Sequence, residues 1–202
     1  MIYQGNGIFR FLLIYFAGSL MIAIFLILAF KLIKRYKSDL TAVLSSFYII
    51  GAFGLIINLI YFPLRIELIV YVLYFITLFS VLYCQIFLVI FNILLYKRDM
   101  DYSNKKILLI ALLYGILLFS AISIPGGFMI NEQTNWRPVF TWWFLFTLYL
   151  IMTVCTILPF TYYLFQLHLI FQDNTIKKKL RLWLFGFWGF TILMYGTLLM
   201  NT

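Results

Sequence analysis

Residues 11–40 read FLLIYFAGSLMIAIFLILAFKLIKRYKSDL, an apolar run followed directly by a basic cluster. As a helix rising about 1.5 Å per residue, the run is long enough to cross roughly 30 Å of hydrocarbon. A cleaved secretory leader carries its positive charge before the apolar core, whereas here the charge follows it. We therefore expect a retained transmembrane helix with its N-terminus outside.

The composition of the whole chain agrees with this interpretation. At 65% hydrophobic and 10% charged, the 202 residues have too little polar surface to cover a soluble globule. The net charge of +9 does not indicate nucleic-acid binding, because the basic residues lie in short connections between apolar runs. Cys84 and Cys155 lie within apolar runs, which favours packing roles over a disulfide or a metal pair.

Six apolar runs reach the length of a membrane span. Each is continuous, whereas the strands of a membrane barrel alternate over about ten residues. We predict a single all-α domain over residues 1–202, a polytopic integral membrane bundle. Its six transmembrane helices are expected at residues 8–30, 40–62, 68–95, 107–124, 139–171 and 182–200.

Helix-breaking and capping residues refine these boundaries. Pro159 removes a backbone hydrogen bond and is expected to kink the fifth helix, with Thr156 or a neighbouring helix satisfying the freed carbonyl. Pro138 fits the first turn of the fifth helix. One of residues 173–175, Asp-Asn-Thr, is expected to cap a sixth helix that begins below the lipid.

Two pairs of glycines occur at three-residue spacing. They are Gly51 with Gly54 and Gly186 with Gly189. Small residues in membrane helices let two backbones approach closely, so we interpret both pairs as helix-packing points.

The basic residues predict the orientation of the bundle. Of the 15 Lys and Arg residues, all except Arg10, Arg65 and Arg137 follow the first, third or fifth run. The positive-inside rule places those three connections in the cytoplasm, or in the equivalent compartment of an organelle. Both termini then lie outside. A multi-pass protein of a prokaryotic plasma membrane is favoured, with an organellar inner membrane as the alternative.

The same basic residues are candidates for contact with lipid or with a partner. A basic side chain near an anionic leaflet contributes about 1 kcal/mol to membrane binding. The candidates for contact with lipid headgroups or an acidic partner are Lys34, Arg35, Lys37, Lys97, Arg98, Lys177, Lys178, Lys179 and Arg181. The expected partners are therefore the bilayer, its anionic headgroups and other membrane protein subunits.

No motif in the chain indicates catalysis. The centres of the predicted helices contain no Asp, Glu, Lys or Arg, which argues against a proton relay, an ion-pair transport site or a voltage sensor. His168 is the only histidine, and one ligand does not hold a catalytic metal. Ser45 and Ser46 have no base beside them in the sequence. We expect no enzymatic activity, no cofactor and no metal site.

Uncharged polar residues inside the runs are the candidates for a ligand site. Gln85 and Asn92 are seven residues apart and share one face of the third helix. Hydrogen bonding between helices, at roughly 0.6 kcal/mol per contact, is the simpler interpretation, and a ligand cavity is the alternative. On the outer side, aromatic residues form either an interfacial belt or an outward-open pocket. The pocket candidates are Asn58, Gln85, Asn92, Thr153, Thr156, Trp136, Arg137 and Trp142.

One resemblance follows from this pattern. Helices without intramembrane charge, an outside N-terminus, an outer aromatic loop, and the basic helix start IKKKLRLWLFGFWGF at 176–190 resemble the seven-helix membrane sensor regions of prokaryotic signalling proteins, including some histidine kinases. The resemblance covers most of the chain and implies a sensor-like or ligand-binding membrane domain. In that family a seventh helix leads to an output domain, whereas this sequence ends outside after six runs. The expectation is a truncated relative or a subunit that acts through partners, and no binding residue is carried over.

Two other functions fit the same composition. One is a structural subunit of a larger membrane complex, an organellar complex included, which predicts aromatic lipid-facing helices and a single protein-contact face. The other is a small solute-binding transport component, similar in size to the substrate-binding components of vitamin uptake systems. Those components have both termini inside, so the topology separates them from a sensor-like domain.

Overall fold

The computed structural model describes residues 13–35, 38–97 and 104–202. Helices dominate this part of the chain, which confirms the all-α prediction. Within the described residues, six helices are long and apolar enough to cross a membrane. They are Tyr15–Arg35, Asp39–Tyr61, Glu67–Tyr96, Lys105–Ile122, Trp142–Ile170 and Asn174–Leu199.

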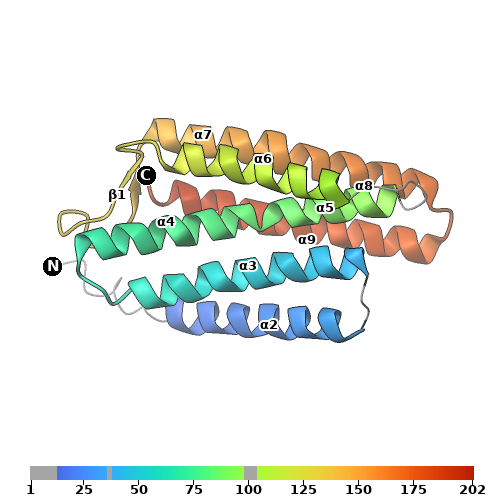
Figure 1. Ribbon diagram of the computed structural model, residues 1–202, viewed down its shortest axis with the longest axis horizontal. Coiled ribbons are helices and arrows are strands. Elements are labelled where there is room, and N and C mark those ends of the chain that lie inside the picture. The colour runs from blue at the N-terminus through green and yellow to red at the C-terminus, as the bar shows by residue number, and fades with distance from the viewer. Residues whose placement is uncertain (1–12, 36–37, 98–103) are drawn as a thin grey trace. The chain divides into compact units, whose positions relative to one another are not determined.

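The chain forms two compact units, Met1–Cys84 and Gln85–Thr202. The elements of the first unit are the π-helical turn η1 (Leu13–Ala17), α2 (Gly18–Arg35), α3 (Asp39–Tyr61) and α4 (Glu67–Tyr83). In this unit α3 packs against both α2 and α4 (Figure 1).

Two glycines explain the close packing of α3. A Cβ added at Gly51 would lie 2.8 Å from the ring of Phe25 on α2. A Cβ added at Gly54 would lie 2.9 Å from Val81 on α4. The prediction that this pair marks close helix approach is confirmed.

The connection between α2 and α3 is set by the residues at the two helix ends. The prediction ended the first helix at residue 30, but α2 continues to Arg35 because Lys and Arg are good helix formers and suit the negative end of the helix dipole. At the start of α3, Thr41 N donates to Ser38 Oγ across 3.3 Å, and Ser38 N donates to Thr41 Oγ1 across 3.1 Å. This reciprocal capping box begins α3 at Asp39.

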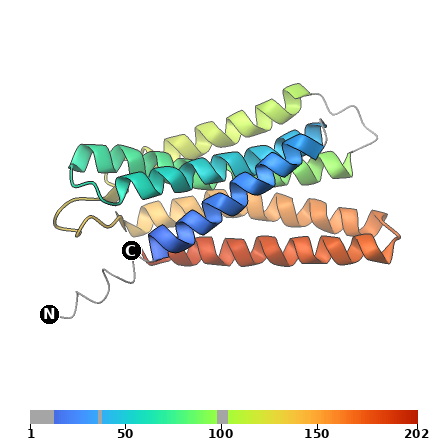
Figure 2. The same cartoon turned by 90° about the horizontal axis from the view of Figure 1, so that it is seen from below.

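The second unit contains the remaining elements. They are α5 (Gln85–Tyr96), α6 (Asn104–Ile122), β1 (Phe128–Met129), β2 (Val139–Phe140), α7 (Trp142–Met152), the π-helical segment η2 (Thr153–Ile157), α8 (Leu158–Ile170) and α9 (Asn174–Leu199). α5 packs against α6, η2 and α8, and α9 packs against α7 and α8. Figure 2 shows the α7–α8 run and α9 side by side.

The start of the fifth helix differs from the prediction. Residues 139–140 are not helical but form β2, which pairs antiparallel with β1 in the register Phe128↔Phe140. Thr141 closes this ribbon, since its N and its Oγ1 both donate to the Gly127 carbonyl, across 3.0 and 3.2 Å. The helix therefore begins at Trp142, and Pro138 precedes β2 instead of lying in the first helical turn.

The sixth helix begins earlier than the apolar run. α9 starts at Asn174 instead of residue 182, with Asp173 as its N-cap, accepting from Thr175 N across 2.7 Å. This confirms the predicted cap. The residues between the cap and the apolar run are mostly Lys, Leu and Arg, which continue a helix readily.

The second glycine pair does not mark a packing point. A Cβ added at Gly186 or at Gly189 would meet no atom of the described chain within 4 Å. The close-approach interpretation was therefore wrong for this pair. The neighbouring Phe185, at 72% exposed, shows that this stretch of α9 presents an open face.

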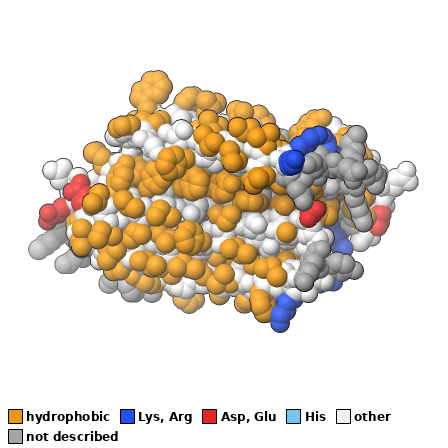
Figure 3. All heavy atoms as spheres, in the orientation of Figure 1, with side chains coloured by type: hydrophobic (Ala, Val, Ile, Leu, Met, Phe, Trp, Pro, Cys, Tyr) orange, Lys and Arg blue, Asp and Glu red, His pale blue; other side chains and the backbone are white. Residues whose placement is uncertain are grey.

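Much of the surface is apolar. Hydrophobic side chains cover most of the face drawn in Figure 3. Trp143 is 82% exposed and Leu193 70% exposed. Large apolar patches of this extent are avoided by soluble monomers and are typical of surfaces that meet lipid or another protein.

Candidate functional site

The interior of the second unit contains two amide side chains on α5. Gln85 and Asn92 are both completely buried. The seven-residue spacing placed them on one face of the helix, and the packing of α5 against α6, η2 and α8 makes that face the buried one. The structure therefore brings two of the sequence-predicted candidates together on one interior surface.

These amides are poorly satisfied. Neither Oε1 nor Nε2 of Gln85 has a hydrogen-bond partner in the described chain, and Nδ2 of Asn92 also has none. Asn92 Oδ1 accepts a long hydrogen bond of 3.4 Å from Trp183 Nε1 on α9. A buried polar group without a partner costs about 1–3 kcal/mol, and native proteins rarely leave one so. Gln85 therefore has the strongest need for an additional polar partner.

Trp183, which donates the hydrogen bond to Asn92 Oδ1, belongs to a cluster of aromatic rings. The Trp183 ring lies 6.0 Å from Phe91 and 6.1 Å from Phe160, measured between centroids. Phe160 is in turn stacked on Phe187 at 3.6 Å. The α5 amides and this aromatic cluster give the interior the character of many small-molecule sites, which have apolar walls and a few polar groups.

A π-helical segment lies beside α5. Pro159 has no N–H to donate, and the helix widens just before it, so that Leu158 N donates to the Thr153 carbonyl. Thr156, which is fully buried, donates its hydroxyl to the Met152 carbonyl and not to the carbonyl freed by Pro159. That expected role for Thr156 was therefore wrong.

Thr153 links η2 to α9. Its hydroxyl donates to the Tyr149 carbonyl across 2.7 Å and shares a 2.7 Å hydrogen bond with the Tyr195 hydroxyl. The Tyr149 hydroxyl donates to the Tyr195 carbonyl across 2.6 Å. Sequence reasoning missed both tyrosines. The four-residue spacing of Tyr149 and Thr153 was a usable signal, but nothing in the sequence pointed to Tyr195.

The other pocket candidates lie elsewhere. Asn58 is half-buried on α3 in the first unit. Trp136 and Arg137 are half-buried in the loop between β1 and β2. Trp142, at the start of α7, is 69% exposed, and the eleven residues from it to Thr153 correspond to about 16 Å of helix. Within the second unit, the structure does not bring Trp136, Arg137 and Trp142 together with the α5 amides.

The basic candidates lie at helix ends. Lys34 and Arg35 end α2, where Lys34 Nζ lies 4.4 Å from the Phe30 ring centroid. In the second unit, Lys97 follows α5, Lys105 and Lys106 begin α6, and Lys177, Lys178, Lys179 and Arg181 lie in the first turns of α9. Lys37 and Arg98 lie outside the described residues.

Apart from Arg137, the described basic residues of the second unit gather at one of its ends. The Tyr96 ring at the end of α5 lies 5.7 Å from Tyr163 in the middle of α8, and Figure 1 shows α5 and α8 running toward the same end of this unit. At the opposite end, Phe140 N donates to the Asn201 carbonyl and joins β2 to the end of the chain. Most of the described lysines and arginines thus lie at one end of this unit, and the strand ribbon, with Arg137 in its loop, lies at the other.

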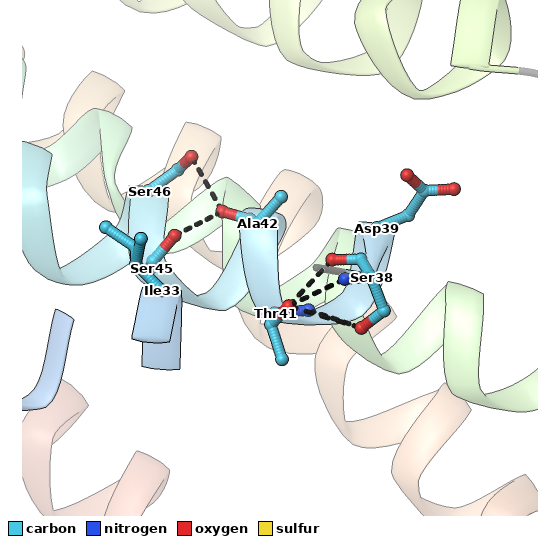
Figure 4. Close-up of a pocket in the computed structure, with 7 residues that line it drawn as sticks. All are labelled: Ile33, Ser38, Asp39, Thr41, Ala42, Ser45 and Ser46. Atoms are coloured by element: carbon cyan, nitrogen blue, oxygen red, sulfur yellow. Dashed lines mark hydrogen bonds between the residues drawn. The ribbon is translucent and has the colours of Figure 1, made fainter. Parts of the chain in front are cut away.

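Figure 4 shows a hollow of about 400 Å³ in the first unit, where α2 ends and α3 begins. It is lined by Ile33, Ser38, Asp39, Thr41, Ala42, Ser45 and Ser46. Ser45 and Ser46 both donate to the Ala42 carbonyl, across 2.8 and 2.9 Å, and Ser38 bonds with Thr41 in the capping box. Its hydroxyls are engaged within their own helix, so the hollow is a feature of the helix start.

No known protein family, curated protein or solved structure matches this chain, so the site is interpreted from its residues and geometry alone.

Proposed function

We propose that this chain is a multi-pass integral membrane protein with six membrane-spanning helices, acting as a sensor-like, ligand-binding domain without enzymatic activity. Six long apolar helices and a surface rich in exposed apolar side chains support insertion into a bilayer. Most basic residues of the second unit lie at one end, with Arg137 as the described exception, which supports an orientation with that end in the cytoplasm and both termini outside.

The topology is tested with a reporter enzyme that is active only outside the cytoplasm. Fused after Thr202, the reporter is expected to be active. Fused after Tyr96, the end of α5, it is expected to be silent because the positive-inside rule keeps this end inside. A silent C-terminal fusion with an active fusion after Tyr96 contradicts the proposal and matches a solute-binding transport component.

The unpartnered Gln85 amide is the observation that carries ligand binding. A side chain that is fully buried with two unsatisfied polar atoms is stabilised by a bound molecule that both donates and accepts a hydrogen bond. An uncharged polar ligand fits best, since neither α5 (QIFLVIFNILLY) nor η2 (TVCTI) contains a charged side chain. Binding at α5 and η2 is then transmitted through Thr153 and Tyr195 to α9.

Replacing Gln85 by Leu is expected to raise the free energy of unfolding of the ligand-free protein by about 1–2 kcal/mol, because it removes two unsatisfied polar atoms. The measurement is chemical unfolding in detergent, followed by tryptophan fluorescence. Asn92→Leu is the matched comparison and is expected to give a smaller gain, since it also deprives Trp183 of its acceptor. Destabilisation by Gln85→Leu contradicts the proposal, because it means that the amide is satisfied by neighbouring helices.

The double variant Gln85→Leu with Asn92→Leu tests binding itself. Uncharged amides and alcohols are screened for those that raise the unfolding temperature of the wild-type protein. Any such compound is expected to lose at least about tenfold in affinity for the double variant, as is usual when a buried polar pair is lost. If the affinity of the double variant is unchanged for every compound, the ligand site is contradicted, and Gln85 and Asn92 only pack between helices.

A further inference from the structure

A concave feature of the second unit lies between α8 and α9. It is a groove of about 140 Å³, comparable to cavities that hold a benzene-sized apolar group. Its apolar walls are Leu164, Phe165, Leu180 and Leu184. This groove is separate from the α5 amides and is not part of the proposed ligand site.

Three polar residues line the same groove: Thr161, His168 and Arg181. The Thr161 hydroxyl is buried and has no hydrogen-bond partner in the described chain. Arg181 is exposed and His168 half-buried. The groove therefore combines the exposed guanidinium of Arg181, the unpartnered hydroxyl of Thr161 and apolar walls.

The charge around the groove is positive. Arg181 follows Lys177, Lys178 and Lys179 along the first turns of α9. The nearest acid in the sequence, Asp173, is engaged as the N-cap and accepts from Thr175 N. The groove thus favours an anion at its arginine and hydrocarbon along its walls.

We propose that the groove between α8 and α9 binds an anionic phospholipid, whose phosphate contacts Arg181 and whose acyl chain lies along the leucines. The planar guanidinium donates two parallel hydrogen bonds to a phosphate, which distinguishes Arg181 from the flexible lysines nearby. The buried Thr161 hydroxyl then donates to an ester carbonyl of the lipid, which gives this orphan group a partner. The inference rests on the membrane insertion proposed above.

The test measures binding of phosphatidylglycerol to the detergent-solubilised full chain by native mass spectrometry. Arg181→Gln is expected to weaken binding about tenfold, because it removes charge-assisted hydrogen bonds to the phosphate. Thr161→Val, which keeps the shape of the side chain, is expected to weaken it about threefold to fivefold. Inorganic phosphate alone is expected not to displace the lipid, since it cannot occupy the apolar walls.

Lys106→Gln is the matched control. It removes the same charge at the start of α6, where Lys106 is exposed and does not line the groove. Its binding is expected to stay within about twofold of the wild type. Equal weakening by Arg181→Gln and Lys106→Gln overturns the proposal, because it means that this end of the unit attracts headgroups only through its net charge. Displacement by inorganic phosphate overturns the role of the acyl chain.

An extraction experiment separates this inference from the proposed function. Retention of the chain in membranes washed with alkaline carbonate supports insertion. If the chain is retained but the Arg181 and Lys106 variants bind phosphatidylglycerol alike, only the groove proposal fails. If alkaline carbonate releases the wild-type chain, membrane insertion itself is contradicted, and the lipid site is contradicted with it.

Discussion

Phe160→Ala is expected to lower the free energy of unfolding by about 3–5 kcal/mol, the usual range for an aromatic residue removed from a packed core. Phe160 is fully buried on α8. Its ring stacks on Phe187 of α9 at 3.6 Å with an interplanar angle of 14°, and lies 6.1 Å from Trp183. The truncation leaves a cavity between two helices that the surrounding aromatic rings are too rigid to fill.

The loss is measured by denaturant unfolding in detergent and compared with that of Phe146→Ala. Phe146 lies on α7 and is 64% exposed, so its truncation opens no cavity and is expected to change the free energy of unfolding by no more than about 0.5 kcal/mol. Comparable losses for the two variants contradict the described packing of α8 against α9.

Gly54→Ala is expected to destabilise the first unit by about 2 kcal/mol. The new methyl group would lie 2.9 Å from Val81 Cγ2, 3.0 Å from Ser80 Cβ and 3.3 Å from the Thr77 carbonyl oxygen. Because two of these atoms belong to the backbone or lie next to it, a side-chain rotation cannot relieve the overlap. α3 and α4 must therefore move apart.

Gly186→Ala is the matched control on α9. It introduces the same methyl group, but at a position where no described atom lies within 4 Å. Alanine favours a helix over glycine by up to about 1 kcal/mol, so this variant is expected to be as stable as the wild type or more stable. The measurement is the unfolding temperature of each variant in detergent. A gain in stability for Gly54→Ala contradicts the close approach of α3 and α4.

The sequence predicted the helices well and their ends less well. Hydropathy reports which residues suit hydrocarbon, whereas a helix ends where its backbone groups find caps. The basic residues after the first run and before the sixth continue the helices beyond the apolar stretch. The β1–β2 ribbon was missed because it depends on Thr141 and Gly127, which meet across a loop. The orientation in the membrane and the sensor-like function stay predictions.

For the candidate site, the sequence supplied the helix face but not its partners. The spacing of Gln85 and Asn92 was sufficient to place them together, because helical periodicity is a local property. It did not reveal that Trp183 meets Asn92 or that Tyr195 meets Thr153, since these pairs are far apart in the chain. The equal spacing of the two glycine pairs likewise gave no means to distinguish Gly54, in contact with a helix, from Gly186, which has none.

The sequence by itself determined the number of long apolar helices, their all-α character and the alternation of basic connections, because each follows from residues that are neighbours in the chain. Only the tertiary structure decided which polar groups are left without a partner. In the sequence, nothing distinguishes Gln85 and Thr161 from the other polar residues in the apolar runs. Their unsatisfied atoms result from the segments that pack around them, and a hydrogen bond requires a donor and an acceptor at a distance that only the folded chain sets.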